Sequence, residues 1–314
     1  MKKKVVVILS LAAALTVALY FVLPGFAVKW VRQSERKSAG LEEKNVRVGD
    51  HEVVYLEGGR GETILMVHGF TANKDNWTRF AKSITPAYHV VALDLPGFGD
   101  STYLEQASYG IVDQAKRLDQ FVNAIGLKRF HIVGNSMGGY IAGRYAVMFP
   151  EKVITLGLFD ASGVTSPEPS EMAKLLAKGE PNPLIVGSAE DFDRMLKFVF
   201  VTPPKIPGFA KKVLVDQAAR HRTSNQRISK QTGAERGALE PDLPKIKART
   251  FVLWGDQDRL VDVSCVKVFE KGLASCTTVI MKDCGHLPMM ERPEEAAKHY
   301  MAFLKSKTDA LPKK

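Results

Sequence analysis

A serine between two glycines is the strongest chemical signal in this sequence. The segment Gly134–Gly138, with the sequence G-N-S-M-G, follows the apolar run Phe130–Val133 and precedes residues 140–146, which have helical spacing. A G-x-S-x-G segment between a strand and a helix is typical of a nucleophile elbow. Its glycines are needed because the turn strains the backbone at the serine and brings strand and helix close together. The pattern predicts Ser136 as a nucleophile and disfavours a glycine-rich loop without a catalytic role.

A serine hydroxyl is a weak nucleophile at neutral pH, so Ser136 needs a base and an acid that orients the base. His286 is the predicted base because its loop, Asp283–Pro288, lies between the last predicted strand and the last predicted helix. That position places it at the carboxyl edge of a sheet, where the serine points. The other histidines are predicted to lie in or beside strands, in helices, or in a structural role: His51, His89, His131, His221, His299 and His68.

Three aspartates are candidates for the orienting acid. Asp258 stands four residues beyond Trp254, far enough to turn back toward His286, and it is the predicted acid. Asp256 lies in the tight turn after the same strand, where a carboxylate commonly stabilises the turn itself. Asp160 follows another predicted strand and remains a third candidate.

The elements that must position these residues alternate along the chain. Short apolar runs without polar alternation fit parallel strands that are buried on both faces, and helical patterns separate them. This arrangement predicts an α/β protein with a doubly wound, mostly parallel sheet. The predicted elements are a hairpin over Val46–Leu56 and strands over Thr63–Val67, His89–Leu93, Phe130–Val133, Val153–Phe159, Phe251–Trp254 and Thr278–Met281.

The alternation is interrupted between residues 161 and 248, a segment that holds nine of the sixteen prolines among short amphipathic pieces. We expect this segment to form a helical lid over Ser136. The predicted organisation is therefore a hydrolytic core of residues 38–160 and 249–314, a lid of residues 161–248, and an N-terminal anchor with its juxtamembrane segment over residues 1–37.

An uncharged run of nineteen residues, Val5–Leu23, follows three lysines at the N-terminus. It is long enough to span a bilayer as one transmembrane helix. The alternative is a cleaved signal, with Pro24 and Gly25 as helix breakers and Gly25–Ala27 as the cleavage site, but the run exceeds the usual apolar region of a signal peptide, about 7–15 residues. Flanking cations on both sides do not decide the orientation. A leader-like start favours a single-pass protein of the cell inner membrane with a periplasmic catalytic domain.

Charge and composition limit the classes of molecule that the protein is expected to bind. The net charge is +10, but six of these charges lie in residues 1–37 and three in the last ten residues, so the body is almost neutral. Nucleic-acid binding requires a basic face on a folded domain, and it is excluded. The residues from Phe26 to Arg32 mix aromatic, aliphatic and basic side chains, which suits a membrane interface. Three cysteines, Cys265, Cys276 and Cys284, allow at most one disulfide. Nothing in the sequence predicts a metal or a cofactor.

Together these motifs resemble the α/β-hydrolase superfamily over residues 44–305. Within it the chain is similar to the monoacylglycerol lipase and bacterial lipase family related to α/β-hydrolase domain-containing protein six, and to bacterial membrane-anchored phospholipases A. The order Ser136, Asp258, His286 is the order of that superfamily. The shared segments are residues 68–71 (HGFT), 134–139 (GNSMGG), 142–143 (AG), 243–246 (LPKI), 254–258 (WGDQD), 284–286 (CGH) and 290–293 (MERP).

The resemblance implies a membrane-anchored serine hydrolase that cleaves acyl esters of phospholipids, lysophospholipids or monoacylglycerols and releases a fatty acid. In this architecture the backbone N–H groups of Phe70 and Met137 form the oxyanion hole. Two alternatives stay open: a carbon–carbon bond hydrolase with the same triad, and a non-catalytic binding module of this fold. Head group, acyl length and the ester cleaved are not indicated. An apolar anchor with an interfacial segment is compatible with a homodimer.

Overall fold

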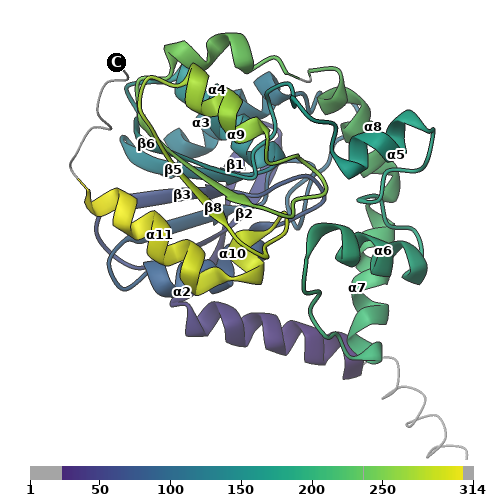
Figure 1. The fold of residues 1–314 in the computed structure, drawn as a ribbon. Coiled ribbons are helices and arrows are strands. Elements are labelled where there is room, and N and C mark those ends of the chain that lie inside the picture. Colours follow the sequence, from purple (N-terminus) through teal and green to yellow (C-terminus); the bar gives the residue numbers. More distant parts are fainter. Residues whose placement is uncertain (1–22, 236, 307–314) are drawn as a thin grey trace, which may run out of the picture.

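A computed structural model describes residues 23–235 and 237–306. Its centre is one sheet of eight strands in the order β1-β2-β4-β3-β5-β6-β7-β8 (Figure 1). The first two strands, β1 (Leu41–Val48) and β2 (His51–Gly58), form an antiparallel hairpin, and β2 also pairs antiparallel with β4. All later pairs are parallel: β3 (Thr63–Val67), β4 (His89–Leu93), β5 (Phe130–Asn135), β6 (Val153–Phe159), β7 (Arg249–Gly255) and β8 (Cys276–Met281).

Alternate side chains of the central strands pack into two separate cores. In β3, Leu65 and Val67 belong to one core, whereas Ile64 and Met66 belong to the other. Successive strand residues point to opposite faces, so apolar residues at every position give a sheet that must be covered on both sides. The expected α/β architecture with a mostly parallel sheet is confirmed, and the burial of both faces of the sheet explains why helices must cover it on both sides.

Helices cover both faces of the sheet (Figure 1). One face carries α3 (Ile111–Ala124), α4 (Met137–Met148) and α9 (Cys265–Gly272), which contribute to the core that contains Leu65. The opposite face carries α2 (Thr78–Ile84), α10 (Pro288–Glu291) and α11 (Pro293–Lys305). The short helix η1 (Lys74–Trp77) directly precedes α2 in the chain.

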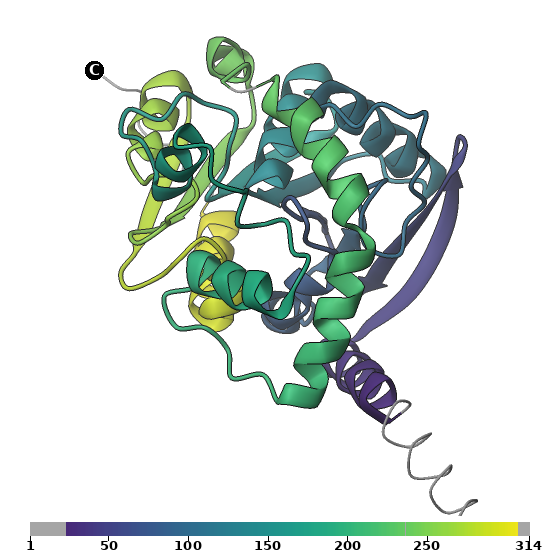
Figure 2. The same ribbon diagram turned by 90° about the vertical axis from the view of Figure 1, so that its right-hand side faces the viewer.

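The segment between β6 and β7 forms α5 (Glu171–Ala177), α6 (Ala189–Val199), α7 (Gly208–Arg220), α8 (Arg222–Gly233) and η2 (Glu240–Lys245). The helices α5 to α7 lie beyond one end of the sheet (Figure 2), whereas η2 packs against α4 and α9. Ser170 and Ser188 cap α5 and α6 by accepting hydrogen bonds from backbone N–H groups of the first turn. The helices predicted for this segment are therefore present.

Residues 23–38 are helical and run along the α2 side of the core (Figure 1). Pro24 and Gly25, which we expected to break a helix, have helical backbone here, because the fixed φ of proline is itself compatible with a helix. The predicted transmembrane run Val5–Leu23 lies outside the described residues, except for Leu23. Within the described ranges, no helix combines the length and the apolar character needed to cross a bilayer.

Candidate active site

Ser136 occupies a strained turn between β5 and α4. Its backbone has φ +57° and ψ −121°, a left-handed conformation that costs a non-glycine residue free energy. The flanking glycines are needed for space: a Cβ atom on Gly134 would lie 2.2 Å from the carbonyl oxygen of Gly138, and one on Gly138 would lie 2.2 Å from that of Val67. The strand, the turn and the helix thus pack closely enough to exclude any side chain at these two positions.

His286 and Asp258 lie together at the carboxyl edge of the sheet. The Nδ1 atom of His286 is 2.7 Å from Oδ2 of Asp258, and both side chains are buried. The other oxygen of Asp258 accepts hydrogen bonds from the N–H groups of Leu260 at 2.8 Å and Val261 at 3.1 Å. These contacts fix the carboxylate, which in turn orients the imidazole and leaves its Nε2 atom for another partner.

The loop of His286 is tied to the elbow that carries Ser136. The side-chain amide of Asn135 donates to the carbonyl oxygens of His286, at 3.0 Å, and Phe159, at 3.1 Å. The N–H of Ser136 donates to the carbonyl of Phe159 at 3.0 Å. The structure therefore brings the elbow, the end of β6 and the histidine loop into one hydrogen-bonded unit.

The loop after β3 lies against Ser136. A Cβ atom on Gly69 would be 3.1 Å from the Cβ atom of Ser136, so the following residue, Phe70, is at the edge of the site. Met137 is the first residue of α4, and N–H groups in the first turn of a helix have no intrahelical acceptor. Both predicted oxyanion donors, Phe70 and Met137, consequently border Ser136.

His68 holds this loop in place as a neutral imidazole. It is fully buried; its Nδ1 atom donates to the carbonyl of Gly69 at 2.7 Å, and its Nε2 atom accepts from the N–H of Leu95 at 3.0 Å. Burial, with a smaller contribution from the charge of Lys74, lowers the pKa of His68 to about 4. The expected structural role of His68, rather than a role as a second base, fits these contacts.

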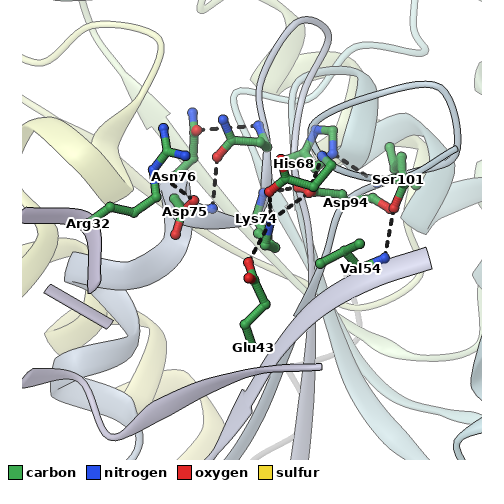
Figure 3. Close-up of polar contacts among 12 residues, drawn as sticks. Arg32, Glu43, Val54, His68, Lys74, Asp75, Asn76, Asp94 and Ser101 are labelled. Atoms are coloured by element: carbon green, nitrogen blue, oxygen red, sulfur yellow. Dashed lines mark hydrogen bonds and ion pairs between the residues drawn. The ribbon is translucent and has the colours of Figure 1, made fainter. Parts of the chain in front are cut away.

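A buried lysine next to this loop was not found from the sequence. Lys74 is fully buried, and its Nζ atom contacts Asp94 at 2.7 Å, Asp100 at 2.5 Å and Glu43 at 3.2 Å (Figure 3). Burial alone would lower the pKa of Lys74, but the carboxylates of Asp94 and Asp100 raise it above its ordinary value. The network joins the ends of β3 and β4 to the β-hairpin.

The network continues into the N-terminal helix. Arg36, also buried, donates from Nε and one terminal nitrogen to the two carboxylate oxygens of Asp75, at 2.6 and 2.8 Å, and forms an ion pair with Glu43 at 2.8 Å. Arg32 pairs with Asp75 at 3.4 Å (Figure 3). Bidentate contacts between arginine and carboxylate are geometrically specific. The N-terminal helix is therefore fixed to the body that carries the site.

A cavity of about 380 Å³ opens above Ser136, a size typical of small-molecule sites. Its lining is mostly apolar, and α5 contributes Met172 and Leu176. The described residues that line the cavity contain no lysine, arginine or histidine. Besides Met172 and Leu176, the lining includes Phe70, Ser136, Met137, Leu184, Val261 and Asp262. The cavity can accept an apolar chain whose end reaches the serine.

Asp256 and Asp160, the other two acidic candidates, do not make the hydrogen bond to Nδ1 of His286, which Asp258 accepts. Asp256 is exposed and accepts the N–H of Cys284 at 3.4 Å, a contact to the histidine loop rather than within its own turn. Asp160 is fully buried beside Asp258. The three cysteines, all in the described part of the chain, form no disulfide with one another.

Comparison with known proteins agrees with this geometry. Residues 62–293 match the family described as alpha/beta hydrolase fold. The chain is 36% identical over 282 residues to Lipase 1 of Psychrobacter immobilis, covering 86% of each protein. It is 32% identical over 311 residues to monoacylglycerol lipase ABHD6 of Bos taurus, covering 95% of this chain and 92% of the relative.

Among solved structures, one described as a membrane phospholipase A and a bacterial virulence factor has a TM-score of 0.92 and 47% identity, covering 96% of this chain and 98% of that chain. The resemblance predicted from the motifs is thereby confirmed. The chain belongs to the α/β-hydrolase family.

Proposed function

We propose that this protein is a membrane-anchored serine hydrolase that cleaves acyl esters of lipids and releases a fatty acid. The observation that carries the proposal is the buried pair of His286 and Asp258 at the same sheet edge as the strained Ser136, under an apolar cavity. The lipase, monoacylglycerol lipase and phospholipase A relatives support lipid ester hydrolysis.

The proposed mechanism uses acyl transfer to the serine. Oγ of Ser136 attacks the ester carbonyl while Nε2 of His286 takes its proton, and Asp258 stabilises the imidazolium that forms. The N–H groups of Phe70 and Met137 bind the oxyanion of the tetrahedral intermediate. His286 then protonates the leaving alcohol. Water, deprotonated by the same imidazole, hydrolyses the acyl-enzyme and restores the serine.

The cavity lining favours esters over the substrates of carbon–carbon bond hydrolases. An aromatic diketone acid carries a carboxylate, which needs a cation when it is buried. The described lining residues supply no cation, and Asp262 would repel an anion. An acyl chain makes no such demand, and side chains such as Met172 and Leu176 adapt to its shape.

We propose further that residues 161–248 act as a lid, separate from the core of residues 38–160 and 249–314. Helix α5 lines the cavity, and the carbonyl of Val199, the last residue of α6, accepts the N–H of His286 at 3.0 Å. Movement of this segment would therefore alter both the cavity and the histidine loop.

Membrane attachment rests on the N-terminal segment. The described helix exposes large apolar side chains, with 69% of Phe26, 66% of Trp30 and 55% of Leu23 accessible. We propose a single-pass anchor over Val5–Leu23 in the inner membrane, a periplasmic catalytic domain, and a homodimer formed through the anchor. Attachment would raise the effective concentration of a lipid substrate at the site.

The decisive experiment is product analysis by mass spectrometry. Detergent-purified protein is incubated with defined phospholipids, lysophospholipids, monoacylglycerols and an aromatic diketone acid. We expect free fatty acid from at least one ester class with the wild type and with Ser34→Ala, an exposed serine on the N-terminal helix, and none with Ser136→Ala.

A fluorophosphonate probe should label the wild type but not Ser136→Ala. Cleavage of the diketone acid alone would instead identify a carbon–carbon bond hydrolase, and absence of all turnover would favour the alternative of a non-catalytic binding module. Carbonate extraction of membranes tests the anchor, since release of the protein into the supernatant would contradict it.

A further inference from the structure

A second buried carboxyl group lies beside the proposed catalytic acid. Asp160 follows β6 directly, has no solvent exposure and adopts φ +46°. One oxygen of Asp160, one oxygen of Asp258 and a ring nitrogen of His286 all lie within 4.8 Å of one another. Asp160 is thus part of the same cluster, although the proposed mechanism does not use it.

The contacts of Asp160 differ from those of Asp258. Oδ1 of Asp160 accepts the N–H of Gly255 at 2.9 Å, whereas Oδ2 is buried and has no hydrogen-bond partner among the described residues. Asp258 accepts from three donors: the N–H groups of Leu260 and Val261, and Nδ1 of His286. An ionised carboxylate is stabilised by such donors, so Asp258 is the better site for the negative charge.

Two buried carboxylates this close cannot both remain ionised. Burial, and then the neighbouring Asp258, raise the pKa of Asp160 well above its ordinary range. The other acidic group that faces it, Glu291, acts in the same direction, and the nearby Cys284 thiol is itself kept protonated because burial raises its pKa. The Nδ1 atom of His286 is already hydrogen-bonded to Asp258 and is therefore not available as a partner for Asp160.

We propose that Asp160 is a positioning residue for the catalytic acid: it is protonated, and it presents the proton on Oδ2 to the carboxylate of Asp258. The proposal rests on the proposed function, because it assumes that Asp258 orients His286 during catalysis. The Gly255 contact fixes which oxygen of Asp160 carries the proton. The imidazole of His286 then faces one negatively charged carboxylate, that of Asp258, rather than two. The hydrogen bond from Asp160 also holds this carboxylate from a direction that its other donors do not cover.

The same three side chains have the chemistry of metal ligands, but a cation would compete for the atoms that hold the imidazole. Oδ2 of Asp258 and Nδ1 of His286 are already hydrogen-bonded to each other at 2.7 Å. Sharing of a proton between Asp160 and Asp258 leaves that bond intact.

The test compares Asp160→Asn and Asp160→Ala in the full-length protein, with a chromogenic short-chain ester as substrate. Asparagine has the charge and shape of a protonated aspartic acid: its oxygen can accept from Gly255 and its amide can donate to Asp258. We expect kcat/KM within about threefold of wild type and an unchanged midpoint on the acid limb of its pH profile. Alanine removes the donor, so kcat should fall about 10- to 100-fold with KM within about twofold.

Two kinetic results would overturn the proposal. If Asp160 were ionised, its replacement by asparagine would remove a charge near His286 and move the acid-limb midpoint down by about one pH unit or more. Wild-type kcat in the alanine variant would exclude positioning. Asp216→Asn, at an exposed aspartate of α7, is the control and should match wild type.

Infrared difference spectroscopy gives a readout that does not depend on turnover. The spectrum of wild type minus Asp160→Asn should contain the C=O band of a protonated carboxyl group that shifts in D₂O, and its absence would refute the proposal even if the alanine variant fails to fold. Ser136→Ala separates the two hypotheses: if that variant still hydrolyses the ester, the proposed function fails, whereas the infrared result still decides the protonation of Asp160.

Discussion

The side-chain amide of Asn135 donates a hydrogen bond to the backbone carbonyl of His286, 3.0 Å away and 151 residues later in the chain. The same nitrogen also donates to the carbonyl of Phe159. Asn135 is fully buried, and the carbonyl of Phe159 also accepts from the N–H of Ser136. The side chain of the residue before Ser136 therefore holds the histidine loop against the end of β5.

We expect Asn135→Ala to lower kcat about tenfold with little change in KM, because the carbonyl of His286 loses its donor at a cost of about 1–3 kcal/mol and the His286 loop shifts, whereas the carbonyl of Phe159 keeps the N–H of Ser136. Steady-state kinetics and the rate of fluorophosphonate labelling measure the effect. Asn45→Ala, on the exposed face of β1, should behave as wild type. Equal kcat in both variants would contradict the role given to Asn135.

Lys74→Met should reduce the free energy of unfolding by about 3–5 kcal/mol, because it leaves the fully buried Asp94 without its cation. Chemical denaturation of the purified protein measures this loss. Lys44→Met removes an ion pair with Glu57 whose lysine is 48% exposed, and the expected cost is only about 0–1 kcal/mol. Similar losses in the two variants would mean that burial of the network has little energetic effect.

His68 should make stability depend on pH. Its folded pKa of about 4 lies below the ordinary value of 6.5, so between these values the unfolded chain binds a proton that the folded chain does not. The stabilisation is therefore complete above pH 6.5 and is lost as the pH falls toward 4, by about 3 kcal/mol in total.

Denaturation of wild type and His68→Gln at several pH values across this range tests the prediction. The glutamine variant should show the smaller decline, since its side chain does not titrate. His299→Gln, at a partly exposed position of α11, should keep the wild-type dependence. Parallel curves for wild type and His68→Gln would show that His68 does not contribute to it.

Gly138→Ala should prevent stable folding, with a loss of about 3 kcal/mol or more. Its Cβ atom would lie 2.2 Å from the carbonyl oxygen of Val67, a backbone atom that cannot move without separating β3 from α4. In Gly208→Ala, at the start of α7, the new Cβ atom has no neighbour within 4 Å, so the melting temperature should stay within a few degrees. Thermal unfolding distinguishes the two variants.

The strands of the sheet were predictable where both faces are buried. The predicted runs Thr63–Val67, His89–Leu93 and Val153–Phe159 coincide with β3, β4 and β6. The hairpin was placed less well, because β1 begins at Leu41 rather than Val46 and residues 42–45 are polar and exposed. Leu41 is buried, but polar residues separate it from the later apolar residues of this edge strand, so no apolar run marks where the strand begins.

The candidate site was predictable as far as it depends on loop position. Asp258 and His286 were chosen because each follows a strand at the same sheet edge, and the structure places them 2.7 Å apart. Their catalytic roles, like that of Ser136, stay predictions. Lys74 could not be found in this way: lysine is almost never fully buried, and its carboxylate partners come from two distant parts of the chain, Glu43 in β1 and the loop that holds Asp94 and Asp100.

The ion pairs of the N-terminal helix bear on how far the chain can be shortened from its N-terminus. Arg36 contributes a buried guanidinium to Asp75 and Glu43, and Arg79 binds Glu35 from the neighbouring α2. A shortened chain that starts at the first strand would lose these contacts and expose the surface that they cover. A shortened form should therefore begin before Arg32, and a protease that cuts inside this helix would destabilise the body that carries the site.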